Sequence, residues 1–306
     1  MKAKIFTILL SIIIISSVAQ NNIGINNPSP DPSAALDVTS TNTGFLPPRI
    51  ADTTAISNPA EGLVIYDLSS HCMRYFNGTL WSDCIGGFSP VTPFTCGGLL
   101  HDNRDGQSYS TVQIGSQCWM AENLNIGIKI NIGSTPSNNG TIEKYCYDNN
   151  NARCNVYGGL YFWNEMMQYE TNEGTQGICP DGWHIPTDDE FCTLYNEVDI
   201  GTISCTGPPN YLGTDAGGNL KETGTSHWNS PNTGATNSSG FTALPSGAFV
   251  TDPNSNYLEL GFSATFWASS TYSNFGLACY LNATSAQVVR SGMPKSNGVS
   301  VRCIKD

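Results

Sequence analysis

Eleven cysteines constrain what this chain can fold into more than any other feature of its sequence. All of them lie from Cys72 to Cys303, well behind the N-terminal segment. No two are spaced C-x-x-C, so a zinc site or a thioredoxin-type redox pair has little support. In an oxidising compartment such cysteines form disulfide bonds, and each bond holds two segments of the chain together. The first question is therefore whether the chain is exported.

The N-terminal segment has the pattern of an export signal. Lys2 and Lys4 precede an apolar run over 5–15, and the small residues Ser17 to Ala19 follow. This is the order of charged region, apolar core and cleavage site in a signal peptide, which we place at 1–19. The apolar run is shorter than the ~20 residues that span a bilayer. We expect a protein that is secreted, or held at the cell surface, after cleavage.

The spacing of the cysteines favours three local disulfides. Cys72 and Cys84 flank an Asn-Gly turn, which predicts a hairpin that brings them together. The other two local pairs are Cys146 with Cys154 and Cys192 with Cys205. The odd total leaves one unpaired thiol or an intermolecular bridge, and Cys118, in an apolar run, is our candidate for the unpaired one.

Residues 179–191, CPDGWHIPTDDEF, gather carboxylates that could serve either a helix or an active site. Thr187 stands three residues before Glu190, the pattern of a capping box, and an apolar series with helical spacing follows. Asp188 and Asp189 then fall in the first turn, where the helix dipole stabilises the ionised carboxylate. A general acid needs the opposite shift, so we interpret this cluster as a helix start rather than a catalytic site.

Two further features of composition narrow the function. Only 12% of the residues are charged, against ~25% in a typical domain, and the net charge is −12. Without a basic patch, a nucleic-acid partner is excluded as the main function. The polar surface must consist largely of Asn, Ser, Thr and Gly, which suits hydrogen bonding to sugars. We expect no cofactor and no metal.

The pattern along the chain predicts two domains. A small β-rich module over 20–85 precedes a Gly/Pro-rich linker over 86–95. The larger region, 96–306, has a helix predicted at 160–169 and the capped helix from Thr187 to about residue 199. Short strands and turns fill the rest, so the fold class is α+β.

Six motifs in 96–306 resemble the Fibrobacter succinogenes major paralogous domain, which is common in exported proteins of Bacteroidetes and Fibrobacteres. They are DGQSYSTVQIGSQCWMAENL, GGLYFWNEMMQY, GICPDGWHIPTDDEFCTL, GGNLKETGTSHWNSPNTGATNSSGFTALPSGAF, FWASS and GVSVRCIKD. The resemblance implies a C-type-lectin-like domain with two helices and short antiparallel strands. It implies no defined activity. The segment IGINNPSPDPSAALDVTSTNTGFLPPRI, followed by GLVIYD and YFNGTLW, resembles a module of Bacteroidetes surface and tail-fibre-like proteins, which implies self-association.

We expect a non-catalytic surface or secreted binding protein, an adhesin or glycan binder. In a lectin-like fold the ligand loops would fall at about 206–260, which offers Trp228, Asn229, Asp252 and Tyr257 as binding residues. The alternative is that the tryptophan is part of the core. The lectin-type calcium signatures Glu-Pro-Asn and Gln-Pro-Asp are absent.

Two other functions remain open. The chain could be a structural tip or decoration of a surface fibre, with the N-terminal module as its attachment. An enzyme is disfavoured, because no G-x-S-x-G, H-E-x-x-H or phosphate loop is present and no carboxylate pair can be nominated. Sulfatase-modifying relatives of the resembled fold use a cysteine pair near the C-terminus. In an oxidised compartment we interpret Cys279 and Cys303 as disulfide partners instead.

Overall fold

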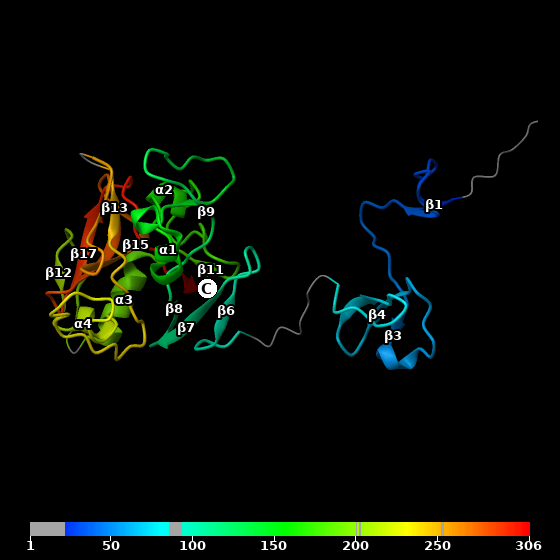
Figure 1. The fold of residues 1–306 in the computed structure, drawn as a ribbon, viewed down its shortest axis with the longest axis horizontal. Helices are drawn as coiled ribbons and strands as arrows, with labels where there is room; N and C mark the ends of the chain where they lie inside the picture. Colours follow the sequence, from blue (N-terminus) through cyan, green and yellow to red (C-terminus); the bar gives the residue numbers. More distant parts are fainter. Residues whose placement is uncertain (1–21, 86–93, 200, 202, 252–253) are drawn as a thin grey trace, which may run out of the picture. The chain divides into compact units, whose positions relative to one another are not determined.

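The computed structural model describes residues 22–85, 94–199, 201, 203–251 and 254–306 (Figure 1). The predicted signal peptide, most of the predicted linker and Asp252 lie outside this range. The chain divides into two compact units, Met1–Thr92 and Pro93–Asp306, and each is described by itself.

The N-terminal unit is β-rich, as predicted. Strand β1 (Ile23–Ile25) pairs in parallel with β2 (Leu36–Val38). A second sheet contains β3 (Arg49–Ile50), β4 (Val64–Asp67) and β5 (Cys72–Tyr75), with β4 and β5 antiparallel. The hairpin expected around the Asn-Gly turn is reduced to two isolated bridges, Phe76 with Trp81 and Met73 with Ile85, and the fully paired hairpin of this sheet is that of β4 with β5.

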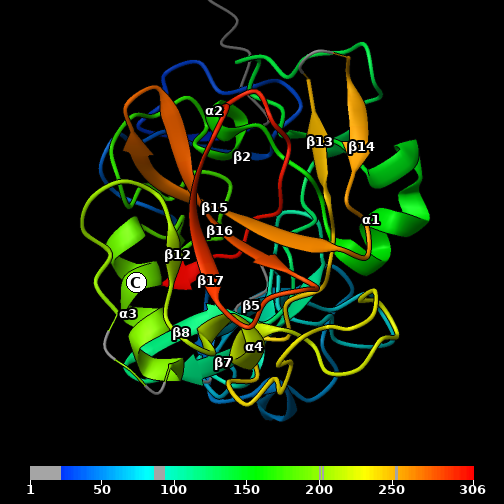
Figure 2. The same ribbon diagram turned by 90° about the vertical axis from the view of Figure 1, so that its left-hand side faces the viewer.

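The second unit contains two main antiparallel sheets. The first has the order β11–β18–β8–β7–β6. The second has the order β12–β17–β16–β15, and its strands are labelled in Figure 2. The strands of the first are β6 (Leu99–His101), β7 (Ser108–Ile114), β8 (Gln117–Met120), β11 (Trp183–His184) and β18 (Ile304–Lys305). Those of the second are β12 (Tyr211–Leu212), β15 (Ser263–Tyr272), β16 (Phe275–Asn282) and β17 (Val288–Met293). Two strand pairs complete the unit: β9 (Ile128–Lys129) with β10 (Glu143–Lys144), and β13 (Ala248–Val250) with β14 (Asn256–Leu258).

The helices of the described residues are few, which makes the fold α+β. They are α1 (Asn151–Tyr157), α2 (Trp163–Met166), α3 (Asp188–Val198) and α4 (Ala216–Leu220). The helix predicted over 160–169 is wrong in extent, because Leu160 and Tyr161 form β-bridges to Tyr145 and Val299. That stretch is apolar on most sides because it lies in the core, and burial of this kind does not distinguish a helix from an extended segment.

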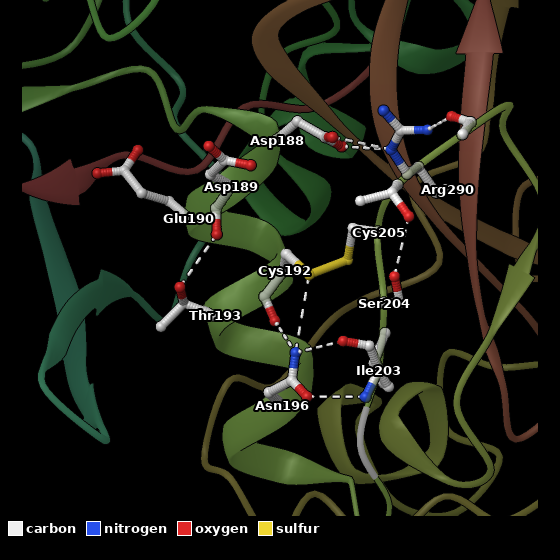
Figure 3. The surroundings of a disulfide bond; sticks show 12 residues. Asp188, Asp189, Glu190, Cys192, Thr193, Asn196, Ile203, Ser204, Cys205 and Arg290 are labelled. Atoms are coloured by element: carbon white, nitrogen blue, oxygen red, sulfur yellow. Dashed lines mark hydrogen bonds and ion pairs between the residues drawn. A yellow bond between two sulfur atoms is a disulfide. The ribbon is translucent and has the colours of Figure 1, made fainter.

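Helix α3 starts as the sequence predicts. The Glu190 amide donates to Thr187 Oγ1 over 3.2 Å, and Glu190 Oε2 accepts from the Thr187 amide over 2.8 Å. These two bonds form a complete capping box. Figure 3 shows Asp188, Asp189 and Glu190 on the first turn of this helix. The acidic cluster is therefore a helix start.

The hydrophobic core lies on both faces of the second sheet. Along β15, Phe266 packs in a cluster with Trp119 and Phe191, while Trp267 packs in another with Trp183. Successive side chains of a strand point to opposite faces, so a strand buried on both sides contributes to two clusters. The second sheet is thus a central layer that other elements cover.

Five disulfides join the described cysteines. The three local pairs are those that the spacing predicts: Cys72–Cys84, Cys146–Cys154 and Cys192–Cys205. Figure 3 shows the last of these. The other two are Cys96–Cys118 and Cys179–Cys303.

Two cysteine predictions are wrong. Cys118 is bonded rather than free, and Cys303 pairs with Cys179 rather than with Cys279. Cys279 is the buried free thiol. It belongs to the cluster on the opposite face of the second sheet from Cys303, which explains why these two residues do not meet.

No helix within the described ranges is long and apolar enough to cross a membrane.

Candidate functional site

Two carboxylates of the acidic cluster at the start of α3, those of Asp188 and Glu190, form ion pairs. His184 Nε2 lies 2.9 Å from Glu190 Oε1, and His184 Nδ1 lies 2.7 Å from Asp306 Oδ1. The hydrogen bond to Glu190 raises the pKa of His184. Burial alone would lower this pKa, but the hydrogen bond to Asp306 raises it further. Arg290 Nε lies 2.8 Å from both carboxylate oxygens of Asp188. Burial raises the pKa of Glu190, but the hydrogen bonds from His184 and Thr187 outweigh it and hold the pKa below its usual value, so this carboxylate is poorly suited to donate a proton.

The predicted ligand residues do not form one surface. Trp228 is only 1% exposed, and its Nε1 donates to the Ala243 carbonyl over 3.0 Å, so it is a core residue. Tyr257 is buried as well, and its hydroxyl lies 3.0 Å from Asn149 Oδ1. Asn229 is exposed, and Asp252 lies outside the described residues. Burial leaves neither aromatic ring a free face for a ligand.

A polar pocket of about 400 Å³ lies beside β7, β8 and α1. Most of its polar groups already bond one another. Asn123 donates to the Tyr157 carbonyl and to Ser300, and its Oδ1 accepts from Arg302. Asn125 accepts from Lys144 and contacts Gln107. A ligand here would have to break this network, and broken buried hydrogen bonds are costly.

A second hollow, of about 270 Å³, lies where β12, β16 and β17 face the β13–β14 pair. Its polar members are Tyr211, Glu259, Tyr280, Ser291 and Asn297, and its apolar members are Ala248, Val250, Leu258, Val289 and Met293. We call this set the tyrosine hollow.

Strand pairing aligns the two tyrosines of this hollow. Tyr211 on β12 lies opposite Val289 on β17, and Val289 in turn lies opposite Tyr280 on β16. Side chains directly opposite one another across a sheet point to the same face. The hollow therefore has a tyrosine on either side of an apolar floor. Tyr211 is 59% exposed, so its ring is open to solvent.

The polar groups of the tyrosine hollow are largely unused. Asn297 is only 5% exposed, yet its side-chain amide has no hydrogen-bond partner in the part of the chain that the structure describes. Within the same residues, neither Ser291 Oγ nor the Tyr211 hydroxyl has a hydrogen-bond partner. Among the described residues the buried side-chain atoms without a partner are Asn232 Oδ1 and Ser263 Oγ, so the polar atoms of the tyrosine hollow are still open to solvent and can bind a ligand or water.

Glu259 adds a carboxylate to this hollow in an unusual backbone conformation. Its φ is 66°, which is left-handed and uncommon for a residue with a long side chain. Its only recorded side-chain bond within the described ranges is a 3.4 Å contact with the Tyr280 hydroxyl. Burial raises the pKa of Tyr280, and the nearby carboxylate adds to the shift, so this hydroxyl stays protonated and can donate. Residues held in such conformations cluster at functional sites.

The comparison with known families gives two matches. The model described as the Fibrobacter succinogenes major domain covers residues 112–305, more than half of the chain. The chain belongs to this family. A model described as a phage tail like trimerisation region matches residues 24–95. Neither a curated protein nor a solved structure shows significant similarity to the chain.

The family assignment confirms both sequence resemblances. The tyrosine hollow lies inside the matched major domain, and the two matches together suggest a surface-associated or fibre-associated protein. The five disulfides agree with an extracellular location. Among the residues described, no three His, Cys, Asp or Glu side chains are grouped so as to hold a metal ion.

Sequence reasoning missed the residues of this hollow. The predicted ligand stretch, about 206–260, contains half of the lining, including Tyr211 and Glu259, although neither was named as a binding residue, and Tyr280 and Asn297 come from later in the chain. Tyr211 and Tyr280 alternate with apolar neighbours in strands, which indicates a sheet face but not which face is open. The pairing of three strands brings them together, and no local signal contains that pairing.

Proposed function

We propose that this protein is an exported, non-catalytic binding protein of a cell surface or fibre, and that it binds a glycan in the tyrosine hollow. The N-terminal unit attaches the protein and assembles copies of it. The family matches support the surface or fibre setting, and the chemistry of the hollow supports the ligand class.

Each part of the hollow suits one part of a sugar ring. The open face of Tyr211 offers an apolar surface for the C–H face of the ring. The Glu259 carboxylate accepts hydrogen bonds from hydroxyls, and the Asn297 amide both donates and accepts. The volume of about 270 Å³ is near the lower end of ligand pockets, which favours one or two sugar units rather than a long chain.

The exposed ring of Tyr211 beside the Glu259 carboxylate carries the proposal. An exposed aromatic face next to a hydrogen-bond acceptor can contact the C–H face of a sugar and bind its hydroxyls together. The Asn297 amide borders the same hollow and adds a donor and an acceptor.

The test is a glycan array with the full mature chain, followed by titration of the glycans that bind. Tyr211→Ala removes the exposed ring and should weaken binding at least tenfold. The matched control is Tyr272→Ala, which removes another exposed tyrosine of the same sheet that lies outside the hollow. Binding that is equally weakened by both changes, or unaffected by Tyr211→Ala, contradicts the proposed site.

An array without any reproducible binding would favour the second candidate, a structural tip of a fibre. The match to a trimerisation region is the observation that supports that alternative. Turnover of a glycan that a single carboxylate substitution abolishes would contradict the non-catalytic role.

A further inference from the structure

Strands β1 and β2 form a ribbon whose two faces differ in character. Their register places Ile23 opposite Leu36 and Ile25 opposite Val38. Alternate residues of a strand share a face, so all four apolar side chains lie on the same side of the ribbon. They are 65%, 49%, 48% and 43% exposed, in the order Ile23, Leu36, Ile25, Val38. We call these four side chains the apolar seam.

The opposite face of the ribbon is covered by the chain itself. Asp37 Oδ2 accepts from Asn27 Nδ2 and from the Asp31 amide, each over 2.9 Å. A Cβ added at Gly24 would collide with the Asn27 carbonyl oxygen at 2.1 Å and with Pro30 at 2.8 Å. The loop between the two strands therefore packs closely on this face and leaves the apolar seam as the uncovered one.

A ribbon of this kind lacks the usual sources of stability. Each strand has three residues, and the described part of this sheet contains no further strand. Isolated two-stranded sheets are marginal in water, and parallel strands normally have both faces covered. The single disulfide of the N-terminal unit, Cys72–Cys84, lies in the other sheet. The apolar seam needs a cover, and neither the loop between its two strands nor a further described strand of this sheet supplies one.

We propose that the apolar seams of three copies of this chain pack against one another around a threefold axis. The match of residues 24–95 to a trimerisation region points to this occupant but does not say which residues meet. The inference deepens the assembly role proposed above for the N-terminal unit. It is independent of the tyrosine hollow. A charge on the seam should then separate the copies, because three like charges would meet in a space without water.

Light scattering of the full mature chain after size-exclusion chromatography tests this arrangement. The wild-type protein should have the mass of three chains, and Ile25→Asp should have the mass of one. The matched control is Leu80→Asp, which places the same charge at another exposed apolar residue of the N-terminal unit, outside the seam. It should remain trimeric. A wild-type monomer or dimer, or a trimeric Ile25→Asp variant, would overturn the proposal.

A second variant distinguishes separation of the copies from unfolding of the ribbon by the introduced charge. Ile25→Cys should give a covalent dimer on a non-reducing gel, because two of three seam residues near the axis can be bridged. Leu80→Cys should stay a single chain under the same conditions, and a single chain for Ile25→Cys would contradict the seam.

Glycan binding per site, measured by titration on Ile25→Asp, should equal that of the wild type. Loss of the trimer with unchanged binding therefore separates this proposal from that of the tyrosine hollow.

Discussion

At the scale of single residues, Lys221 shows how this chain buries a charge without an opposite one. Its ammonium donates to the carbonyls of Thr233, Asn282 and Ser285, each over 2.9 Å, and its side chain is fully buried. Burial lowers the pKa of Lys221 to about 8. One ammonium thus satisfies three loop carbonyls, which links three separate segments of the chain.

Replacement of this lysine by methionine should be strongly destabilising. Lys221→Met keeps the length of the side chain but leaves three buried carbonyls without their donor, so we expect a loss of about 3 kcal/mol in urea unfolding. Between pH 8 and about 10.4, unfolded Lys221 keeps a proton that the folded residue has lost, so this residue makes folding more favourable as pH rises. The stability difference between wild type and variant should therefore widen over that interval. Lys305→Met, in the terminal strand, is the control and should change little.

At the scale of elements, Asp199 joins the end of α3 to the start of α4. Its Oδ2 accepts from the amides of Thr214, Asp215 and Ala216 over 2.7 to 2.9 Å, and its Oδ1 accepts from Gly201 over 2.8 Å. Burial raises the pKa of Asp199, but the four amide bonds outweigh it and hold the pKa at about 2. A carboxylate at the start of α4 takes up amides that have no partner within the helix.

The acid dependence of this junction can be measured. Asp199→Asn should reduce the free energy of unfolding at pH 7 by about 1 to 2 kcal/mol, a value that allows for solvent screening of a partly exposed group. The pKa is lower in the folded state than in the unfolded one, so the stabilisation is complete above about pH 4 and is lost as the pH falls toward 2. The two proteins should then converge. Asp181→Asn serves as an exposed control, and a gap that persists at pH 2 would contradict the assignment.

At the scale of the whole molecule, the disulfides differ greatly in the length of chain that they close. Cys179–Cys303 spans 124 residues and ties the segment before α3 to the last strand, whereas Cys146–Cys154 spans 8. In the chain-entropy model the disulfide that closes the longer loop stabilises the folded state more, by about 5 kcal/mol against about 2.5 kcal/mol.

Removal of each bond with paired serines tests this difference. Cys179→Ser with Cys303→Ser should lower the stability about twice as much as Cys146→Ser with Cys154→Ser, as measured by thermal unfolding of the full chain. The free Cys279 serves as an internal reporter. Burial raises its pKa to about 12, so it should react with a thiol reagent only when the domain opens. Equal losses from both double variants would show that strain or residual structure, rather than loop length, controls the stability.

The features that could be predicted from the sequence are local ones. The capping box of Thr187 and Glu190 and the three short-range disulfides each depend on residues within a few turns or one loop of each other. The α+β class follows from the same local periodicities. Likewise, the long motifs were enough to identify the family, because they are contiguous stretches of chain.

The features that failed, or were missed, depend on which face of a strand meets which partner. Cys279 and Cys303 are both in apolar, strand-like segments, yet they lie on opposite faces of one sheet, and only the packing of that sheet separates them. The tyrosine hollow likewise arises from three strands paired across a sheet, with Asn297 brought in from a later loop. A sequence specifies the period of each strand, but the register and the covering elements arise only from long-range contacts, and these decide which residues are left open to a ligand.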